Sequence, residues 1–238
     1  LIVILRAHIV RVVLGSGEFD WTDTRLTAAV LAVFSLGLAA QGLMLLLVRG
    51  YYAAGRTLIP FLVAASAAIG TIVFSVLFLR IFQDPVFMQF MEDVMRIEDV
   101  PGSSILALSL AYSLVSIVSL LVIAVHFEFH FGSFFSRIRR TFFEGLASAL
   151  ASGAAAYLVL YALGPLTLTP TLLSVFLRGF AAGILGIAAG AFTYWLLGNH
   201  EYRETVEAIR AKIWRTSKAE EMIVVTSAED IGAPGSPR

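Results

Sequence analysis

The residues of this sequence best suited to metal chemistry are the two histidines and the glutamate in His126-Phe127-Glu128-Phe129-His130. Imidazole and carboxylate groups are common metal ligands. On a helix, His126 and His130 share one face because they are four residues apart, whereas Glu128 points away. No third ligand stands at a suitable spacing, and the 238 residues include no cysteine. We therefore predict no metal site here.

Other polar patterns give no indication of catalysis. Gly15-Ser16-Gly17 is not followed by the lysine that a phosphate-binding loop requires, so we interpret it as a turn. No nucleophile and base have the arrangement typical of hydrolysis or group transfer, and we predict no catalytic residue and no cofactor. Four hydroxyl groups lie in an otherwise apolar stretch, where bonding back to the helix backbone is their ordinary role. They belong to Ser109, Tyr112, Ser113 and Ser116.

Five long stretches of the sequence carry no charged side chain. A helix needs roughly 20 apolar residues to cross the hydrocarbon layer of a bilayer, and each stretch is long enough. The chain is 58% hydrophobic and 14% charged, against about 25% charged residues in soluble domains. These features predict an all-α fold, a polytopic transmembrane helix bundle, and the net charge of zero indicates no nucleic-acid partner. The stretches are residues 26–48, 57–79, 100–127, 145–177 and 179–200.

Five full crossings follow from these stretches. The turn that begins at Gly164-Pro165 ends the fourth crossing, and the rest of that stretch joins the fifth. Asp23 or Thr24 is the expected N-cap of the first crossing. Residues 1–5 are apolar and contain neither an initiator methionine nor a basic leader. We expect them to be the end of a sixth, earlier helix, and the chain to be a C-terminal fragment. The expected crossings are residues 26–48, 57–79, 104–126, 142–163 and 171–197, and the phenylalanines between 127 and 135 are expected to mark a membrane interface.

Two shorter segments have the pattern of amphipathic helices. Asp84-Pro85 is a typical pair of N-cap and first helical residue, and apolar residues at spacings of three and four continue through residues 84–99. We predict a helix there that lies on the membrane surface. A second amphipathic helix is expected over residues 200–215, followed by a disordered tail over 216–238.

The distribution of lysine and arginine predicts the orientation, because basic residues collect on the cytoplasmic side of a membrane. One side receives Arg49 and Arg56, the arginines of 137–140 and the basic residues of 203–218. The opposite side receives three arginines, accompanied by eight carboxylates. This orientation places the C-terminus in the cytoplasm and the amphipathic helix 84–99 outside.

The segment from Leu14 to Pro60 carries two motifs with one helix between them. The first runs Leu14-Gly15-Ser16-Gly17-Glu18-Phe19-Asp20 and continues with Asp23-Thr24. The second runs Arg49-Gly50-Tyr51-Tyr52-Ala53 and continues with Thr57 and Pro60. This segment closely resembles the MurJ/MviN family of bacterial lipid II flippases, which is similar to the multidrug/oligosaccharidyl-lipid/polysaccharide exporter group. Arg56 departs from the family, which usually carries an acidic residue there.

The resemblance implies a fold and domain organisation. The family has fourteen transmembrane helices, in two six-helix lobes followed by two extra helices, so the five crossings would be helices ten to fourteen. Residues 1–140 would then complete the second lobe, and residues 141–199 would be the two extra helices. The arginines of the family's central cavity would lie upstream of this sequence.

The resemblance also implies a transporter rather than an enzyme. Its cargo would be lipid II, an undecaprenyl-diphosphate-linked muropeptide, moved across the bacterial inner membrane by alternating access of the two lobes. The implied partners are lipid II, membrane lipids and the cell-wall synthesis machinery.

The candidate binding residues are two arginines and a row of glycines. Arg178 either anchors the outer end of a helix or faces a polar cavity, and Arg49 either anchors a helix end or marks a cytoplasmic gate. Small residues let helices pack closely in lipid, so the glycines serve either plain packing or, as the resemblance implies, a groove for the polyprenyl tail. The row is Gly179, Gly183, Gly186 and Gly190, and the expected facing residues are Gly145, Ala149 and Gly153.

Three other functions remain open at this point. A flippase or exporter of another polyprenyl-linked glycan, of O-antigen or exopolysaccharide type, would have the same architecture. A membrane glycosyltransferase or acyltransferase would need catalytic residues in a large extramembrane loop, whereas the longest internal loop here is the segment of about 20 residues around the helix 84–99. A polytopic scaffold would transport nothing.

Overall fold

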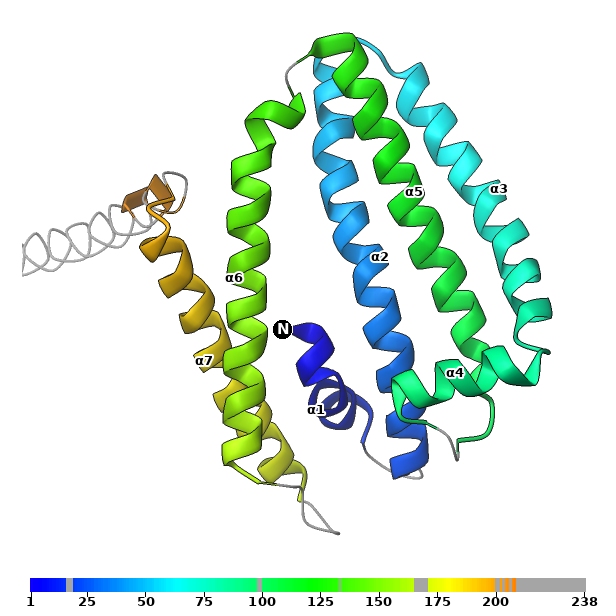
Figure 1. Cartoon of the computed structure of the whole chain (residues 1–238), viewed down its shortest axis with the longest axis vertical. Coiled ribbons are helices and arrows are strands. Elements are labelled where there is room, and N and C mark those ends of the chain that lie inside the picture. Colours follow the sequence, from blue (N-terminus) through cyan, green and yellow to red (C-terminus); the bar gives the residue numbers. More distant parts are fainter. Residues whose placement is uncertain are drawn as a thin grey trace, which may run out of the picture. The chain divides into compact units, whose positions relative to one another are not determined.

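The computed structural model describes residues 1–15, 19–97, 100–132, 134–164 and 171–199, and five residues between 202 and 208. Every regular element in these residues is a helix (Figure 1). Five of the helices are long and apolar enough to cross a membrane, which confirms the predicted all-α polytopic bundle. The elements are α1 (Ile2–Leu14), α2 (Trp21–Ala53), α3 (Leu58–Ile81), α4 (Pro85–Met95), the short 3-10 helix η1 (Ser103–Ile105), α5 (Leu106–Phe131), α6 (Phe134–Ala162) and α7 (Leu172–Leu196).

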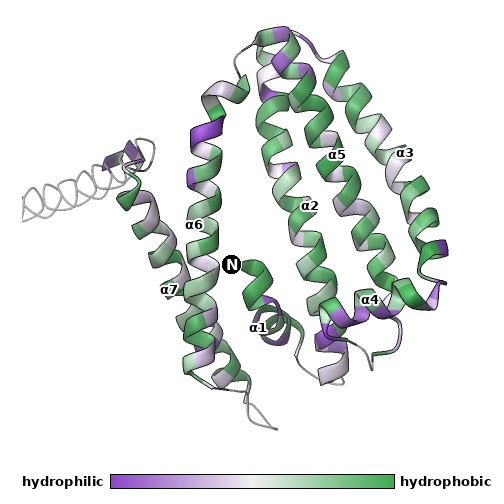
Figure 2. Cartoon of the chain, in the orientation of Figure 1, coloured by the Kyte–Doolittle hydropathy of each residue, from purple (hydrophilic) through white to green (hydrophobic). Residues whose placement is uncertain are grey.

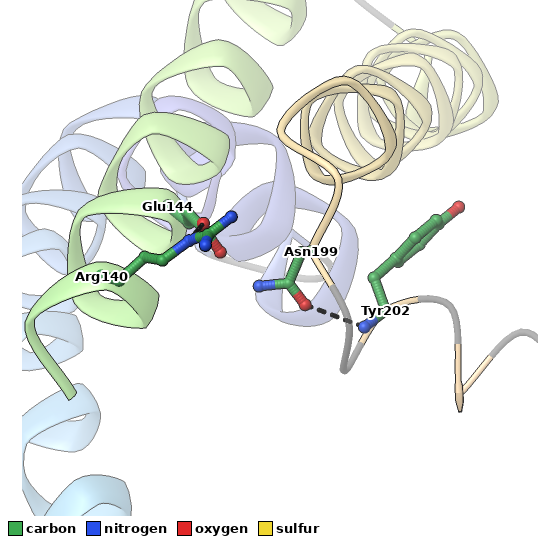
Figure 3. Close-up of polar contacts among 4 residues, drawn as sticks. All are labelled: Arg140, Glu144, Asn199 and Tyr202. Carbon is green, nitrogen blue, oxygen red and sulfur yellow. Dashed lines mark hydrogen bonds and ion pairs between the residues drawn. The ribbon is translucent and has the colours of Figure 1, made fainter. Parts of the chain in front are cut away.

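The chain divides into two compact units, Leu1–Gly190 and Ala191–Arg238. In the second unit, Oδ1 of Asn199 accepts a hydrogen bond from the backbone N–H of Tyr202 at 2.9 Å (Figure 3). The ring of Tyr202 also stacks on that of Tyr194. The predicted helix over 200–215 is described at five residues only, and the predicted tail over 216–238 lies outside the described residues.

The start of α2 differs from the prediction. Its N-cap is Asp20, whereas Asp23 or Thr24 was the expected cap. Oδ1 of Asp20 accepts from the backbone N–H of Asp23 at 2.8 Å, and Oδ2 of Asp23 accepts from that of Asp20 at 3.2 Å. This reciprocal pair is a capping box, and it lets the helix begin before the charge-free stretch. The 33 residues of α2 are about 50 Å long.

The first helix is also longer than the expected residues 1–5, since α1 runs to Leu14. Leu5 and Val10 are buried, and between them the helix carries the polar residues Arg6 and His8. The guanidinium of Arg11 donates to the backbone carbonyl of Phe19 at 3.0 Å. This bond ties the end of α1 to the start of α2.

Helices α2, α3 and α5 form a bundle in which α5 makes the most extensive contacts between described helices. In Figure 1, α5 lies between α2 and α3, and α3 contacts α5 along its length while it barely contacts α2. A small residue allows α2 and α5 to approach, because Gly37 lies against Tyr112 and Ser113 of α5. The hydroxyl of Ser113 donates to the carbonyl of Val33 at 2.7 Å across this contact. Figure 2 shows apolar residues along all three helices, as lipid contact requires.

The amphipathic helix α4 caps one end of this bundle. Its predicted start is confirmed, because Oδ1 of Asp84 accepts from the N–H of Val86 at 2.9 Å and Pro85 occupies the first helical position. A cluster of apolar residues from α2, α5 and the segments that flank α4 is buried beneath it. Arg96 ends the helix with a left-handed backbone (φ 60°), and its carbonyl accepts a hydrogen bond from the Arg25 guanidinium. The location of α4 on a membrane surface stays a prediction.

The boundary between α5 and α6 was predicted incorrectly. Helix α5 continues through the aromatic segment to Phe131, and α6 begins at Phe134 rather than near residue 142. The chain turns at Gly132, whose φ is +65°, and Oε2 of Glu128 accepts from the N–H of Phe135 at 2.9 Å. The segment 137–140 therefore belongs to α6. One of its arginines, Arg140, pairs with Glu144 at 2.6 Å (Figure 3).

Candidate functional site

A cavity of about 380 Å³ lies between α2, α3 and α5. Helix α5 separates the other two, so residues of α2 and α3 form its walls and α5 contributes its floor. Its position near the middle of α3 places it within the membrane-spanning part of the bundle. The lining residues are Gln41, Met44, Leu45, Val48, Ala64, Ala67, Ala68, Thr71, Tyr112, Val115, Ser116 and Ser119.

Local packing explains why space remains there. The Tyr112 ring stacks on Phe34, with centroids 4.3 Å apart and planes within 8°, which fixes the ring against α2. The facing turn of α3 carries three alanines, Ala64, Ala67 and Ala68, whose short side chains do not reach α2. Gly70 of α3 faces Val115 of α5, and a Cβ atom at Gly70 would lie 3.5 Å from the Val115 side chain. The backbones of α3 and α5 are therefore close to each other at this point.

The cavity is uncharged and mostly apolar, with five hydrogen-bonding side chains among its twelve lining residues. Ser116 and Ser119 are only 6% and 7% exposed, and neither hydroxyl has a hydrogen-bond partner among the described residues. The same holds for the side-chain amide of Gln41 and the hydroxyl of Tyr112. Thr71 is the exception, because its hydroxyl donates to the carbonyl of Ala67 at 2.9 Å. Such groups can donate to and accept from neutral polar ligands, and they offer no charge to a diphosphate.

The histidine pair lies at the end of α5 farthest from α4. The Tyr51 hydroxyl and Nδ1 of His126 share a hydrogen bond of 2.6 Å, and Tyr51 is completely buried. His130 stacks on His126 with ring centroids 4.0 Å apart, so the two do share one face as predicted. Phe127 and Phe131 pack edge-on against Tyr51. This cluster joins the ends of α2 and α5, and the described residues contain no group of three metal-ligating side chains.

The two candidate arginines have different surroundings. Arg49 is exposed near the end of α2 and forms no ion pair with another described residue. Arg178 is partly buried, and its guanidinium donates to the carbonyl of Gly164 at 3.2 Å. Gly164 lies two residues beyond the end of α6 at Ala162, close to the helix C-terminus, where a cation is favourable. Arg178 thus joins α7 to the end of α6, in keeping with an anchoring role.

The glycine row contacts two different helices. Gly179 packs against His8 and Gly183 against Leu5, both in α1. His8 carries a buried Nδ1 without a hydrogen-bond partner in the described structure. Toward the other end, Gly186 and Gly190 lie against α6, and Gly186 also meets the side chain of Leu1. There Gly186 contacts Ser152 and Ala156, and Gly190 contacts Ser148 and Ser152.

The face of α6 that meets the row differs from the expected one. Ser148, Ser152 and Ala156 make the contacts, and the Ser148 hydroxyl donates to the carbonyl of Gly190 at 3.0 Å. Gly153, which was expected to face the row, instead lies near Ile4. Both faces repeat small residues every four positions, so spacing alone could not distinguish them.

Sequence reasoning missed most of the cavity. Gln41 and Thr71 lie inside charge-free stretches, and a polar amide at that depth is itself a signal for function. Back-bonding was predicted for the hydroxyls of α5, and Ser109 does donate to the carbonyl of Leu106 at 3.0 Å. Ser113 instead bonds another helix, and Ser116 faces the cavity.

The cavity and the bundle that forms it fall within one family match. The family model "Lipid II flippase MurJ" matches residues 1–177, from α1 into α7. The chain belongs to this family of lipid II flippases. It is therefore a multi-pass membrane protein of a family devoted to transport of a peptidoglycan precursor. No curated protein and no solved structure matches the sequence. The whole lining of the cavity lies in the matched region, whereas the glycine row begins beyond it.

Proposed function

We propose that the protein moves lipid II from the cytoplasmic to the external leaflet of the bacterial inner membrane. The family match over residues 1–177 carries this proposal. Two observations support it: five helices are suited to crossing a membrane, and three of them enclose an uncharged cavity with five hydrogen-bonding side chains. The mechanism would be alternating access, in which two lobes rock about a central cavity, and it requires no covalent chemistry, so the protein is not an enzyme.

In this proposal the first 140 residues complete the second lobe and residues 141–199 are the two extra helices. Positive residues concentrate at the α2–α3 turn, the start of α6 and the C-terminal segment, which supports a cytoplasmic C-terminus and an external α4. The membrane lipids and the cell-wall synthesis machinery are the expected partners besides the cargo.

Two groups of candidate residues keep a proposed role. Arg49 has a free guanidinium in the described structure at the proposed cytoplasmic end, where it could contact the diphosphate or act in a gate. The row of Gly179, Gly183, Gly186 and Gly190 could line a path for the polyprenyl tail, although its contacts with α1 and α6 are also those of plain packing.

The proposal is tested with the full-length protein at normal membrane levels in cells depleted of their own flippase. Restored growth is expected, and failure to restore it contradicts the proposal. Reconstituted vesicles then separate the alternatives. Flipping of lipid II supports the proposal, preferential flipping of another polyprenyl-linked glycan indicates the related exporter class, and no transport of any lipid-linked glycan indicates a scaffold.

A further inference from the structure

Four side chains that line the same cavity have no hydrogen bond to another residue within the described part of the chain. The Gln41 amide comes from α2, and the hydroxyls of Tyr112, Ser116 and Ser119 come from α5. In hydrocarbon an unsatisfied polar group is strongly unfavourable, so these groups need water or a ligand as a hydrogen-bond partner. A cavity of this kind is therefore expected to hold something that hydrogen-bonds.

The chemistry of the lining excludes some possible ligands of the cavity and favours others. All twelve lining residues are uncharged, so nothing there compensates the charge of a diphosphate. A polyprenyl tail would fill the space but leave the amide and the three hydroxyls unsatisfied. Groups that both donate and accept, such as hydroxyls and amides, match those of the lining. About 380 Å³ is also within the range of small-ligand sites and holds roughly ten waters.

We propose that this cavity binds the uncharged, hydroxyl- and amide-bearing part of the glycan head group of the cargo. The inference rests on the proposed function, and it names a second contact region separate from any site for the diphosphate. The apolar residues of the lining, such as Met44 and Val115, would contact the carbon face of a sugar, while the four polar groups bond its substituents. The stack between Tyr112 and Phe34 would hold the Tyr112 hydroxyl in position.

The test uses single cysteines, because the sequence contains none of its own. Ser119→Cys and Thr71→Cys place a thiol on two sides of the cavity, and Ser66→Cys is the control, since Ser66 is exposed on α3 outside the lining. The full-length protein in nanodiscs, with no other cysteine, is treated with a charged methanethiosulfonate reagent. The labelling rate is measured alone, with lipid II and with undecaprenyl diphosphate, which has the same tail and diphosphate but no sugar.

We expect labelling of both cavity cysteines and protection by lipid II only. At a lipid II concentration ten times the Kd, the rate falls about tenfold, because about one site in ten is then free. Undecaprenyl diphosphate leaves the rate unchanged, and the Ser66→Cys rate responds to neither lipid. Equal protection by both lipids overturns the inference, because the tail or the diphosphate would then occupy the cavity. Absence of labelling in both cavity variants overturns it in favour of a covering helix, and labelling without protection shows a cavity that holds water only.

A second variant keeps the test independent of cysteine chemistry. Tyr112→Phe removes one hydroxyl but retains the stacked ring, so folding is preserved. Its affinity for lipid II is expected to fall about fivefold, with no change for undecaprenyl diphosphate. An unchanged affinity for lipid II contradicts the inference. If the wild-type protein neither binds nor flips lipid II, the proposed function itself has failed; if it does both and the cavity remains unprotected, only this inference fails.

Discussion

Gly37 of α2 lies directly against Ser113 of α5. A Cβ atom on Gly37 would stand 3.0 Å from the Cα and from the Oγ of Ser113, closer than side chains normally pack. The same serine donates a hydrogen bond to the carbonyl of Val33. The contact between the two helices therefore depends on a missing side chain in one and a hydroxyl in the other.

Gly37→Ala should destabilise the protein, because the added methyl meets the backbone of α5. Overpacking of this kind typically costs about 1–3 kcal/mol. The control is Gly42→Ala on the same helix, where the new Cβ meets no atom within 4 Å and a gain of up to about 1 kcal/mol in helix propensity is expected. Thermal unfolding in detergent compares the two. Equal melting temperatures would mean that α2 and α5 do not approach as described.

Tyr51→Phe should lower stability by about 1 kcal/mol. The change removes the hydroxyl that shares a 2.6 Å hydrogen bond with His126, while the buried ring keeps its aromatic neighbours. The neighbouring Tyr52 is 55% exposed, so Tyr52→Phe is a matched control with little expected effect. The measurement is again the midpoint of thermal unfolding. A Tyr51→Phe protein as stable as the control would show that the hydrogen bond contributes nothing.

Alanine substitutions in the glycine row separate packing from a tail groove. Gly186→Ala should destabilise by about 1–3 kcal/mol, because its Cβ would meet three atoms at close range. These are Cδ1 of Leu1 at 2.6 Å, the carbonyl oxygen of Ser152 at 3.0 Å and the Cβ of Ala156 at 3.3 Å. Gly183→Ala meets only the flexible end of Leu5 at 3.5 Å and should be neutral or slightly stabilising. Unfolding temperature and lipid II flipping are measured for both. Loss of flipping in Gly183→Ala at normal stability would favour the groove.

Arg49→Ala should leave the unfolding temperature unchanged, since exposed surface changes away from packing features are usually within about 0.5 kcal/mol. Arg49 is exposed and has no ion-pair partner among the described residues. A functional role would then appear as slower flipping, with partial recovery in Arg49→Lys. Full transport activity in Arg49→Ala would leave only the role of a helix-end anchor.

Arg178→Ala should destabilise the junction of α6 and α7. The substitution removes the guanidinium that donates to the Gly164 carbonyl at 3.2 Å, and hydrogen bonds to charged groups contribute about 1.5–3 kcal/mol. Limited proteolysis between α6 and α7, alongside thermal unfolding, measures the effect. If the variant is as stable as the parent but transports lipid II more slowly, Arg178 faces a polar cavity rather than anchoring the helix.

The sequence by itself determined the number and type of the membrane-spanning elements. Hydrophobicity over some 20 neighbouring residues decides whether a helix crosses a bilayer, so the crossings could be located without tertiary information. The start of α4 was equally predictable, because Asp84 and Pro85 form a local cap. The resemblance in Leu14–Pro60 gave the family correctly.

Helix ends and helix faces were decided by the tertiary structure. Helix α2 begins at Trp21 through the Asp20 capping box and is tied to α1 by Arg11, and α6 begins at Phe134 because the chain turns at Gly132. Helices that are apolar all round carry little information about which face turns inward. The rotation that brings Gln41, Thr71 and Ser119 to one cavity follows from contacts such as Gly37 with Ser113 and Phe34 with Tyr112. Those contacts join residues more than 70 positions apart, and only packing between helices selects them.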